Sequence, residues 1–314
     1  MKFLVTGGAG FIGSNLVSAL VRRGDSVVVL DDFSTGKHAN LAEVADRIRL
    51  VEGSLTDADG VREAMQGADY VLHQAALASV QRSVDDPVTS NAVNVDGTLN
   101  VLVAARDAGV KRVVYAASSS AYGDTEVLPK HEDMPPAPLS PYALQKWVGE
   151  EYCRIFSALF GLDTIALRYF NVFGPRQDPA SHYAAVIPIF ITKMLANSPP
   201  TIYGDGEQSR DFTYIDNVVA ANLQACEGAP KRGQVVNIAC GERFTLNDLC
   251  RSLAAKIGVD IRPRYAEPRQ GDVRHSMADV RRAAEVLGWK PQVDFDSGLE
   301  RTVDWYRNVL SASR

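Results

Sequence analysis

The sequence predicts an α/β fold in which a doubly wound parallel sheet carries a smaller carboxy-terminal α/β lobe. Short apolar segments alternate with segments of helical periodicity over roughly the first 170 residues, which is typical of βαβ units. The first apolar segment, Lys2–Thr6, runs directly into a glycine-rich turn. A chain of 314 residues with 46% hydrophobic content can also bury a large core.

Charge and composition exclude several classes of protein. A net charge of −5 argues against a nucleic-acid-binding surface, although local arginines can still bind an anionic substrate. No apolar run approaches the ~20 residues that span a bilayer, and Met1–Val5 is better explained as a buried strand than as a signal peptide. The four cysteines lack metal-like spacing and are expected to be free thiols. We expect a soluble cytoplasmic enzyme without a metal, a nucleic-acid partner or a membrane segment.

Gly7, Gly10 and Gly13 lie between the first strand and a helix expected to end near Arg23. Such glycines permit a tight turn and let the backbone approach a pyrophosphate, which then faces the free N–H groups of the helix. A plain tight turn is the alternative. We predict a Rossmann-type dinucleotide site.

The second strand, Ser26–Leu30, is followed by Asp31. An acidic side chain at this place binds the adenosine ribose hydroxyls and so favours NAD over NADP. Two alternatives stay open: a simple turn carboxylate, and tolerance of a 2′-phosphate through Lys37.

The alternation continues along the chain. The expected elements are buried strands at Arg49–Glu52 and Tyr70–His73, helices at Asp57–Gln66 and Val88–Ala108, and a strand at Arg112–Ala117. Ligands bind beyond the carboxyl ends of such strands, so segments 73–77, 117–120 and 168–171 are expected to line the site. We also expect segment 214–238 to return to the sheet.

A candidate general base lies in the helix expected from Pro141 to about Phe160. Tyr142 and Lys146 are four residues apart and share one helix face. Ionising a phenol near neutral pH requires roughly 4 kcal/mol of help, which a nearby ammonium can supply. Ser118 ends a strand in the same presumed cleft and could hydrogen-bond a substrate hydroxyl. The alternatives are a chance pair on a surface helix and a serine-rich turn; without a GxSxG elbow, hydrolysis is discounted.

The chain resembles the extended short-chain dehydrogenase/reductase family, in its sugar-nucleotide branch. Three features carry the resemblance in combination: Gly7-x-x-Gly10-x-x-Gly13, Ser118 at the end of a strand, and Tyr142-x-x-x-Lys146. The resemblance covers essentially the whole chain. It implies an NAD-binding domain at 1–170 plus about 214–238, and a UDP-sugar-binding lobe at 171–213 and 239–314. It also implies a homodimer by analogy.

The resemblance implies a set of cofactor-binding residues. These are Gly7, Gly10, Phe11, Ile12, Gly13, Asp31, Asp32, Ser34, Gly36, Ser54, Leu55, Gln74, Ala75, Ala76, Asn94, Tyr142, Lys146 and Tyr169. Ala75 and Ala76 are small enough for a nicotinamide to lie close, or they pack in the core. The family usually has Gly-Asp where this chain has Gly53-Ser54, which puts the adenine contact in doubt.

It further implies a UDP-sugar site with Ser118, Tyr142 and Lys146 as catalytic residues. The expected substrate-binding residues are Ala78, Ser79, Ser118, Ser119, Ser120, Tyr142, Asn171, Gln177, Ala185, Val186, Tyr203, Arg210, Arg269, Asp272 and Ser276. Segments 76–80, 183–188 and 271–276 resemble those of bacterial UDP-N-acetylglucosamine 4-epimerases. Serine at position 276, where relatives can carry tyrosine, leaves room for an N-acetyl group.

The expected activity is reversible, NAD-dependent C4 epimerisation of UDP-hexoses, N-acetylated ones first and UDP-glucose/UDP-galactose second. A UDP-hexuronate 4-epimerase is one alternative, because Arg82 and Arg274 could meet a carboxylate. A 4,6-dehydratase is disfavoured because Ser119 and Ser120 replace the Asp-Glu pair of those enzymes. A non-catalytic NAD-sensing regulator of the same fold is the alternative from another class.

Overall fold

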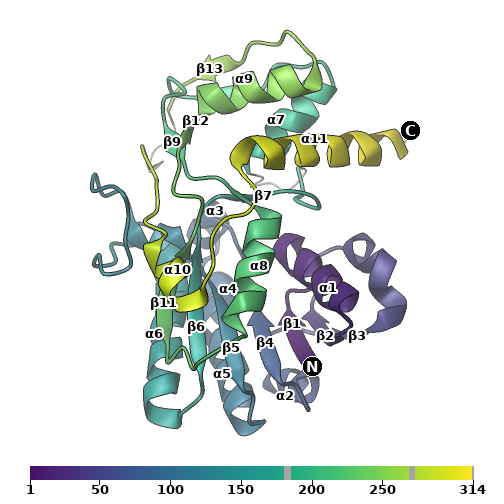
Figure 1. Cartoon of the computed structure of the whole chain (residues 1–314), viewed down its shortest axis with the longest axis vertical. Coiled ribbons are helices and arrows are strands. Elements are labelled where there is room, and N and C mark those ends of the chain that lie inside the picture. The colour runs from purple at the N-terminus through teal and green to yellow at the C-terminus, as the bar shows by residue number, and fades with distance from the viewer. Residues whose placement is uncertain (180–184, 269–272, 313–314) are drawn as a thin grey trace.

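The structure is a computed structural model that describes residues 1–179, 185–268 and 273–312. Its centre is a seven-stranded, wholly parallel sheet in the order β11-β6-β5-β4-β1-β2-β3 (Figure 1). The strands are β1 (Lys2–Thr6), β2 (Ser26–Asp31), β3 (Ile48–Glu52), β4 (Tyr70–His73), β5 (Arg112–Ser118), β6 (Thr164–Tyr169) and β11 (Gln234–Ile238). The doubly wound parallel sheet predicted from the sequence is confirmed.

Alternate residues of each strand enter different cores, because side chains of a strand point to opposite faces of the sheet. In β1, Phe3 and Val5 belong to one apolar cluster and Leu4 to the other. The first cluster is covered by α1 (Phe11–Arg23) and α8 (Ile215–Ala225). The second is covered by α2 (Ala58–Met65), α5 (Gly97–Asp107) and α6 (Pro141–Phe160). Both faces of the sheet are therefore buried.

One expectation needs correction. The strand at Arg49–Glu52 is not buried: β3 is the edge of the sheet, and Leu50 is 41% exposed. The helix expected over Val88–Ala108 is confirmed as a continuous helical run. It consists of α4 (Pro87–Asn91), a π-helical turn η2 (Ala92–Asp96) and α5, and a separate short helix, α3 (Val80–Asp85), precedes it. Two 3-10 helices complete the domain: η1 (His38–Arg47) and the short η3 (Ser119–Tyr122).

The carboxy-terminal part builds a smaller lobe over the carboxyl ends of the strands, at the top of Figure 1. It contains α7 (Val186–Leu195), α9 (Leu246–Ile257), α11 (Phe295–Ala312), and the strand pairs β8 (Thr201–Tyr203) with β13 (Arg264–Ala266) and β9 (Ser209–Arg210) with β12 (Phe244–Thr245). β7 (Val172–Phe173) pairs with β10 (Thr213–Tyr214), and α10 (Arg281–Leu287) packs near β11. As expected, segment 214–238 returns to the sheet, because β11 pairs with β6.

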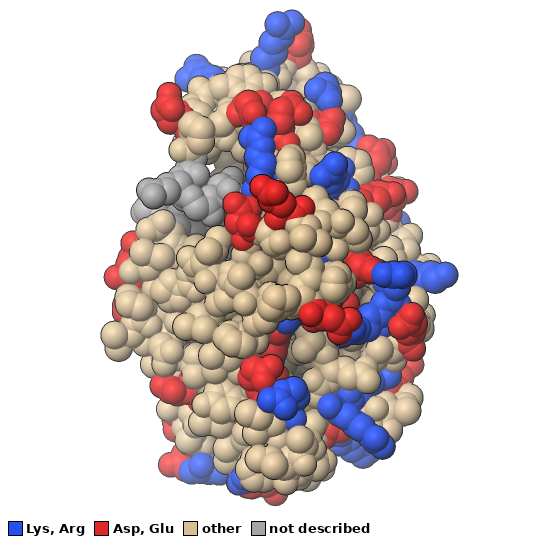
Figure 2. Space-filling model, turned by 90° about the vertical axis from the view of Figure 1, so that its left-hand side faces the viewer, with Lys and Arg blue, Asp and Glu red and all other residues tan. Residues whose placement is uncertain are grey.

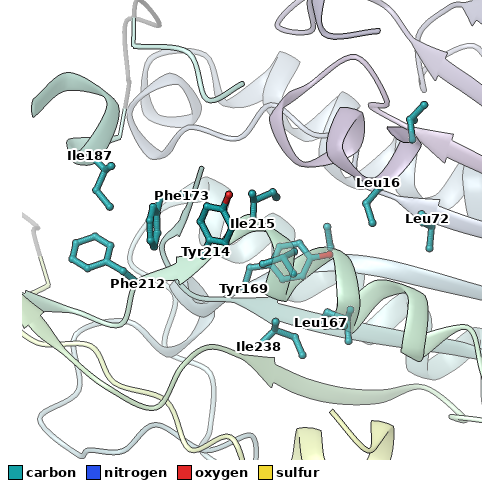
Figure 3. Packing of buried hydrophobic residues seen from close by; sticks show 14 of the residues in the cluster. Leu16, Leu72, Leu167, Tyr169, Phe173, Ile187, Phe212, Tyr214, Ile215 and Ile238 are labelled. Atoms are coloured by element: carbon teal, nitrogen blue, oxygen red, sulfur yellow. The ribbon is translucent and has the colours of Figure 1, made fainter. Parts of the chain in front are cut away.

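One apolar cluster runs from the sheet into this lobe (Figure 3). Leu16 and Leu72 lie at the end nearest the first strands, and Phe212 lies at the other. In the lobe, the rings of Phe212 and Phe244 stack on Phe295, with centroids 5.4 and 4.0 Å apart. The lobe is thus packed onto the sheet through a shared core, which fixes the walls of the space between them.

Within the described residues, no helix is both long enough and apolar enough to cross a membrane. On the face shown in Figure 2, basic and acidic side chains are interspersed, and a broad central area carries neither.

Candidate active site

The turn between β1 and α1 forms a cradle that only glycine can line. A Cβ added at Gly13 would lie 2.0 Å from the carbonyl oxygen of Gly7, and one at Gly7 would lie 2.7 Å from the Cα of Ala75. Gly7 also has a φ of +67°, where larger residues are strained. Gly10 precedes α1 and offers no side-chain cap, so the first N–H groups of the helix face the cleft. This arrangement suits the pyrophosphate of a dinucleotide.

Asp31 is held at the end of β2 with its carboxylate directed to the cleft wall. Its two oxygens accept hydrogen bonds from the backbone N–H groups of Ala9 and Phe33, at 2.8 and 2.9 Å. Burial raises the pKa of Asp31. Each carboxylate oxygen has a second lone pair for a ribose hydroxyl. Lys37 forms an ion pair with Asp178 at 2.7 Å and does not line this cleft, which fits NAD better than NADP.

Most of the expected cofactor residues line one cleft along the carboxyl ends of β1, β2 and β4. They are Gly7, Gly10, Phe11, Ile12, Gly13, Asp31, Asp32, Ser34, Leu55, Gln74, Ala75 and Ala76. Ala78, expected to bind substrate, lies in the same cleft. The cleft is also lined by Leu77, from the expected segment 73–77, and by four residues that sequence reasoning missed: Leu30, Thr35, Gly53 and Val93.

Three expected cofactor residues are not among those that line this cleft. Gly36 packs against the Asp31 carboxylate, since a Cβ there would lie 2.7 Å from Oδ1. Ser54 hydrogen-bonds Thr56 at 2.9 Å. Asn94 accepts a hydrogen bond from the N–H of Leu77 at 2.8 Å and so holds the loop after β4. Gly36 and Asn94 thus support residues of the cleft, whereas the contact of Ser54 lies outside it.

The expected base, Tyr142, lies beside Ser118, which is the last residue of β5. Ser140 caps α6 by accepting a hydrogen bond from the N–H of Ala143 at 3.2 Å, which fixes the start of the helix. The hydroxyl of Tyr142 is hydrogen-bonded to Ser118. The Oγ of Ser118 in turn accepts hydrogen bonds from the hydroxyl and the N–H of Ser120, at 2.9 and 3.2 Å.

Lys146 lies one turn further along α6, and the hydrogen bond of its ammonium goes to a backbone carbonyl. The Nζ donates a hydrogen bond to the carbonyl oxygen of Ala116 at 2.9 Å and lies 5.0 Å from the ring centroid of Tyr115. Burial lowers the pKa of Lys146 to about 8. Burial also raises the pKa of Tyr142, and the influence that lowers it is the hydrogen bond with Ser118. The help expected from Lys146 is therefore not seen in the protein alone.

A second cleft, which we call the sugar cleft, adjoins this pair. Of the expected residues it is lined by Ser118, Ser119, Ser120, Tyr142, Tyr169, Asn171, Arg210 and Ser276. It is also lined by Val80, Gln81, Gly123, Lys130 and Val273, which sequence reasoning did not identify. Residues from β5, β6, α6 and the lobe thus meet in one place. Tyr169, expected at the cofactor, lies here with its hydroxyl 3.3 Å from Gln74.

Other expected substrate residues lie elsewhere in this structure. Ser79 caps α3 by accepting from the N–H of Arg82 at 3.1 Å. Gln177 donates to the carbonyl oxygen of Val172 at 3.1 Å and lines neither cleft. Tyr203 lines a separate groove with Arg274.

The last four expected substrate residues lie at or inside gaps in the described chain. Ala185 and Val186 open α7, directly after segment 180–184, which is not described. Arg269 and Asp272 lie outside the described residues. All of these stay predictions.

Comparison with known proteins assigns the family. The model of the NAD dependent epimerase/dehydratase family matches residues 3–239, which is more than half of the chain. This protein belongs to the NAD-dependent epimerase/dehydratase family. The glycine cradle and the Asp31 carboxylate fit the cofactor that gives the family its name.

Three members of the family illustrate the similarity. The UDP-glucose 4-epimerase of Mycolicibacterium smegmatis is 42% identical, over 98% of this chain and 99% of the relative. The Thermotoga maritima UDP-glucose 4-epimerase, solved with UDP-glucose, is 40% identical with a TM-score of 0.94, covering 99% of this chain and 100% of that one. The UDP-N-acetylglucosamine 4-epimerase of Methanobrevibacter ruminantium, solved with UDP-N-acetylmuramic acid, is 41% identical with a TM-score of 0.94 over 98% of both chains.

Proposed function

We propose that this protein is an NAD-dependent UDP-sugar 4-epimerase, an isomerase. The observation that carries the proposal is the hydrogen bond between Tyr142 and Ser118 at the wall of the sugar cleft, beside a glycine cradle fitted to a dinucleotide. Relatives of about 40% identity over the whole chain are named as enzymes of this activity.

In the proposed mechanism, Tyr142 removes the proton of the C4 hydroxyl and returns it after the sugar has turned over. Ser118, which already shares a hydrogen bond with the phenol, holds the C4 oxygen beside it. Lys146, held by the carbonyl oxygen of Ala116, contributes positive charge to the same region of the site. NAD, held by the glycine cradle and Asp31, would supply a reversible hydride acceptor for the C4 carbon, so that the reaction involves no net oxidation.

Turning the sugar requires that the rest of the substrate stays anchored. Arg210 reaches the sugar cleft from β9, and a guanidinium suits diphosphate oxygens. Asn171, at the end of β6, lines the same cleft. We propose that these two residues hold the substrate, together with Arg269 and Asp272 as the family resemblance implies.

We propose the pair UDP-N-acetylglucosamine/UDP-N-acetylgalactosamine as the first substrates and UDP-glucose/UDP-galactose as the second. The argument is the size of the side chain at position 276. Ser276 lines the sugar cleft and is only 7% exposed, so its small volume adds to the space available to a C2 substituent. A bulkier residue at this place would reduce that space.

A UDP-hexuronate is the alternative substrate. The structure weakens the argument that Arg82 and Arg274 meet its carboxylate. Arg274 forms a two-pronged ion pair with Asp205, at 2.9 and 2.8 Å, in a groove separate from the sugar cleft. Arg82 is only partly buried on α3 and does not line the sugar cleft. Dehydration stays disfavoured, because Ser119 and Ser120 cannot act as acid and base near neutral pH.

We also propose that the chain forms a homodimer in the cytoplasm. Val84, Val88 and Leu144, on α3, α4 and α6, are exposed by 54%, 79% and 45% although they are aliphatic. These three helices contact one another, so they offer a continuous surface for a second copy.

A substrate panel tests the proposed function. Purified protein with NAD is incubated separately with UDP-N-acetylglucosamine, UDP-glucose and UDP-glucuronate, and the C4 epimers are separated by chromatography. We expect conversion of the first two, with the higher kcat/KM for the N-acetylated sugar. An absence of C4 epimer from all three would leave a nucleotide-binding regulator as the better account.

A further inference from the structure

Lys130 is buried at the wall of the sugar cleft, and its backbone is held there firmly. Its side chain is only 2% exposed. Its N–H donates to the carbonyl oxygen of Met277 at 2.8 Å, and its carbonyl oxygen accepts from Asp279 at 2.9 Å. These two hydrogen bonds therefore join the chain around Lys130 to the segment that directly follows Ser276. Its position lines the same cleft as Tyr142 and Ser118.

The ammonium of Lys130 has spare hydrogen-bonding capacity. It donates one hydrogen bond, to the carbonyl oxygen of Gly123 at 2.9 Å, out of the three that an ammonium can make. Among the described residues it has no carboxylate within ion-pair distance; Asp124, which is exposed, acts only through its charge. A buried cation without an anionic partner is unfavourable.

A second cation, Arg210, lines the same cleft as Lys130. Burial lowers the pKa of Lys130, the negative charge of the exposed Asp124 raises it, and the positive charge of Arg210 lowers it. The nearby cleft residues Ser118, Ser119, Ser120 and Ser276 are neutral. Two cations thus face one cleft whose other polar side chains carry no charge, which is the arrangement that a negatively charged ligand would offset.

We propose that Lys130 is a substrate-binding residue that donates a hydrogen bond to an anionic oxygen of the bound sugar nucleotide. This inference rests on the proposed function and assigns a role that the sequence did not suggest. The anionic oxygen has two sources: the diphosphate, present in every substrate, or a carboxylate on the sugar, present only in a hexuronate. The first makes Lys130 a general anchor, and the second makes it a specificity determinant.

A purely structural role for Lys130 has a matched control in Lys231. Lys231 is also buried, at 7% exposure, donates to one backbone carbonyl, that of Val286 at 2.8 Å, and has a pKa lowered by burial. It does not line the sugar cleft. Replacing either lysine removes a buried ammonium from a carbonyl oxygen, but of the two only Lys130 lines the sugar cleft.

The test compares the wild type, Lys130→Met and Lys231→Met, each loaded with NAD, by calorimetric titration with UDP, UDP-glucose and UDP-glucuronate. Loss of a partner to a desolvated anion is expected to weaken binding at least roughly tenfold. In Lys130→Met, a comparable loss for all three ligands supports the diphosphate as partner. A loss confined to UDP-glucuronate supports the carboxylate. Lys231→Met is expected to bind all three as the wild type does.

Unchanged affinity of Lys130→Met for all three ligands would overturn the inference, and so would an equal loss in Lys231→Met. A wild type that binds none of the ligands would instead overturn the proposed function. If Lys130→Met does not fold, a crystal structure of the wild type with UDP-glucose and with UDP-glucuronate decides. An Nζ within hydrogen-bond distance, ~2.7–3.2 Å, of a phosphate or carboxylate oxygen supports the inference. An Nζ farther than that from every such oxygen in both complexes overturns it.

Discussion

Lys146 donates its ammonium hydrogen bond to the carbonyl oxygen of Ala116, 2.9 Å away, and not to the hydroxyl of Tyr142 one turn before it on α6. The two residues expected to act as one unit therefore have separate partners in the protein alone. Tyr142 is left with Ser118 as the neighbour that favours its anion, while burial opposes ionisation. A positive charge brought by the cofactor would favour the phenolate further.

The first prediction is that NAD⁺ lowers the pKa of Tyr142. Burial raises this pKa above its ordinary value of 10, so without cofactor the phenol stays protonated at pH 8. A nearby positive charge stabilises the phenolate and shifts the pKa downward. Addition of NAD⁺ at pH 8 should raise the phenolate absorbance near ~295 nm in the wild type. Tyr142→Phe is the control, and an equal rise in that variant would show that another tyrosine responds.

The second prediction concerns how much the burial of the charged Lys146 ammonium lowers the free energy of unfolding. Its pKa of about 8, against an ordinary 10.5, means that holding the charged form in the fold costs roughly 3 kcal/mol below pH 8. Between about pH 8 and 10.5 the unfolded chain keeps the proton that the folded chain has released, so this cost disappears as pH rises.

Lys146→Met should therefore unfold at higher urea concentration than the wild type at pH 7, with a gain of up to about 3 kcal/mol. The gain should shrink steadily toward pH 10, while epimerase activity is lost at every pH. A variant less stable than the wild type at pH 7 would show that the hydrogen bond to Ala116 outweighs the desolvation of the ammonium.

The third prediction is that Ser276→Tyr changes substrate preference. A phenol in place of the hydroxymethyl group fills part of the sugar cleft. The ratio of kcat/KM for UDP-N-acetylglucosamine over UDP-glucose should fall by roughly tenfold or more, because a small steric change in a fitted pocket is worth about 1–3 kcal/mol. Ser276→Ala should leave the ratio nearly unchanged. A constant ratio in Ser276→Tyr would place the N-acetyl group elsewhere.

The fourth prediction tests the glycine cradle. Gly13→Ala should abolish measurable NAD binding, because the added Cβ would lie 2.0 Å from the carbonyl oxygen of Gly7 and force the turn open. Gly24→Ala is the control: its φ of +85° makes alanine unfavourable by about 1 kcal/mol, but nothing lies within 4 Å of the added Cβ. Fluorescence titration with NAD should show a loss in the first variant only.

Much of the fold could be predicted because its signals are local. β1 begins and ends at the residues expected, α1 ends at Arg23, and α6 runs from Pro141 to Phe160. Each has a nearby start or stop signal, such as Gly10, the Ser140–Pro141 cap or Gly161 at the end of α6. The exposure of β3 could not be predicted, because its place at the edge depends on the order of all seven strands.

The site was predictable to the extent that its residues lie in short motifs. The glycines, Asp31, Ser118 and Tyr142 were identified because each follows or precedes a recognisable element. Lys130 was not, since its neighbours in the chain carry no motif and contacts with residues distant in the sequence, such as Met277, Asp279 and Asn237, hold it at the cleft. The orientation of the Lys146 ammonium also depends on packing against β5.

The central claim is that Tyr142 moves the proton of the sugar C4 hydroxyl while NAD is in the adjoining cleft. The most direct measurement is the rate of C4 conversion of UDP-N-acetylglucosamine by NAD-loaded wild type and Tyr142→Phe, followed by proton NMR. The variant should keep its NAD and its substrate affinity but convert the sugar at least about a hundredfold more slowly, as expected for loss of a general base. Equal rates in the two proteins would contradict the account.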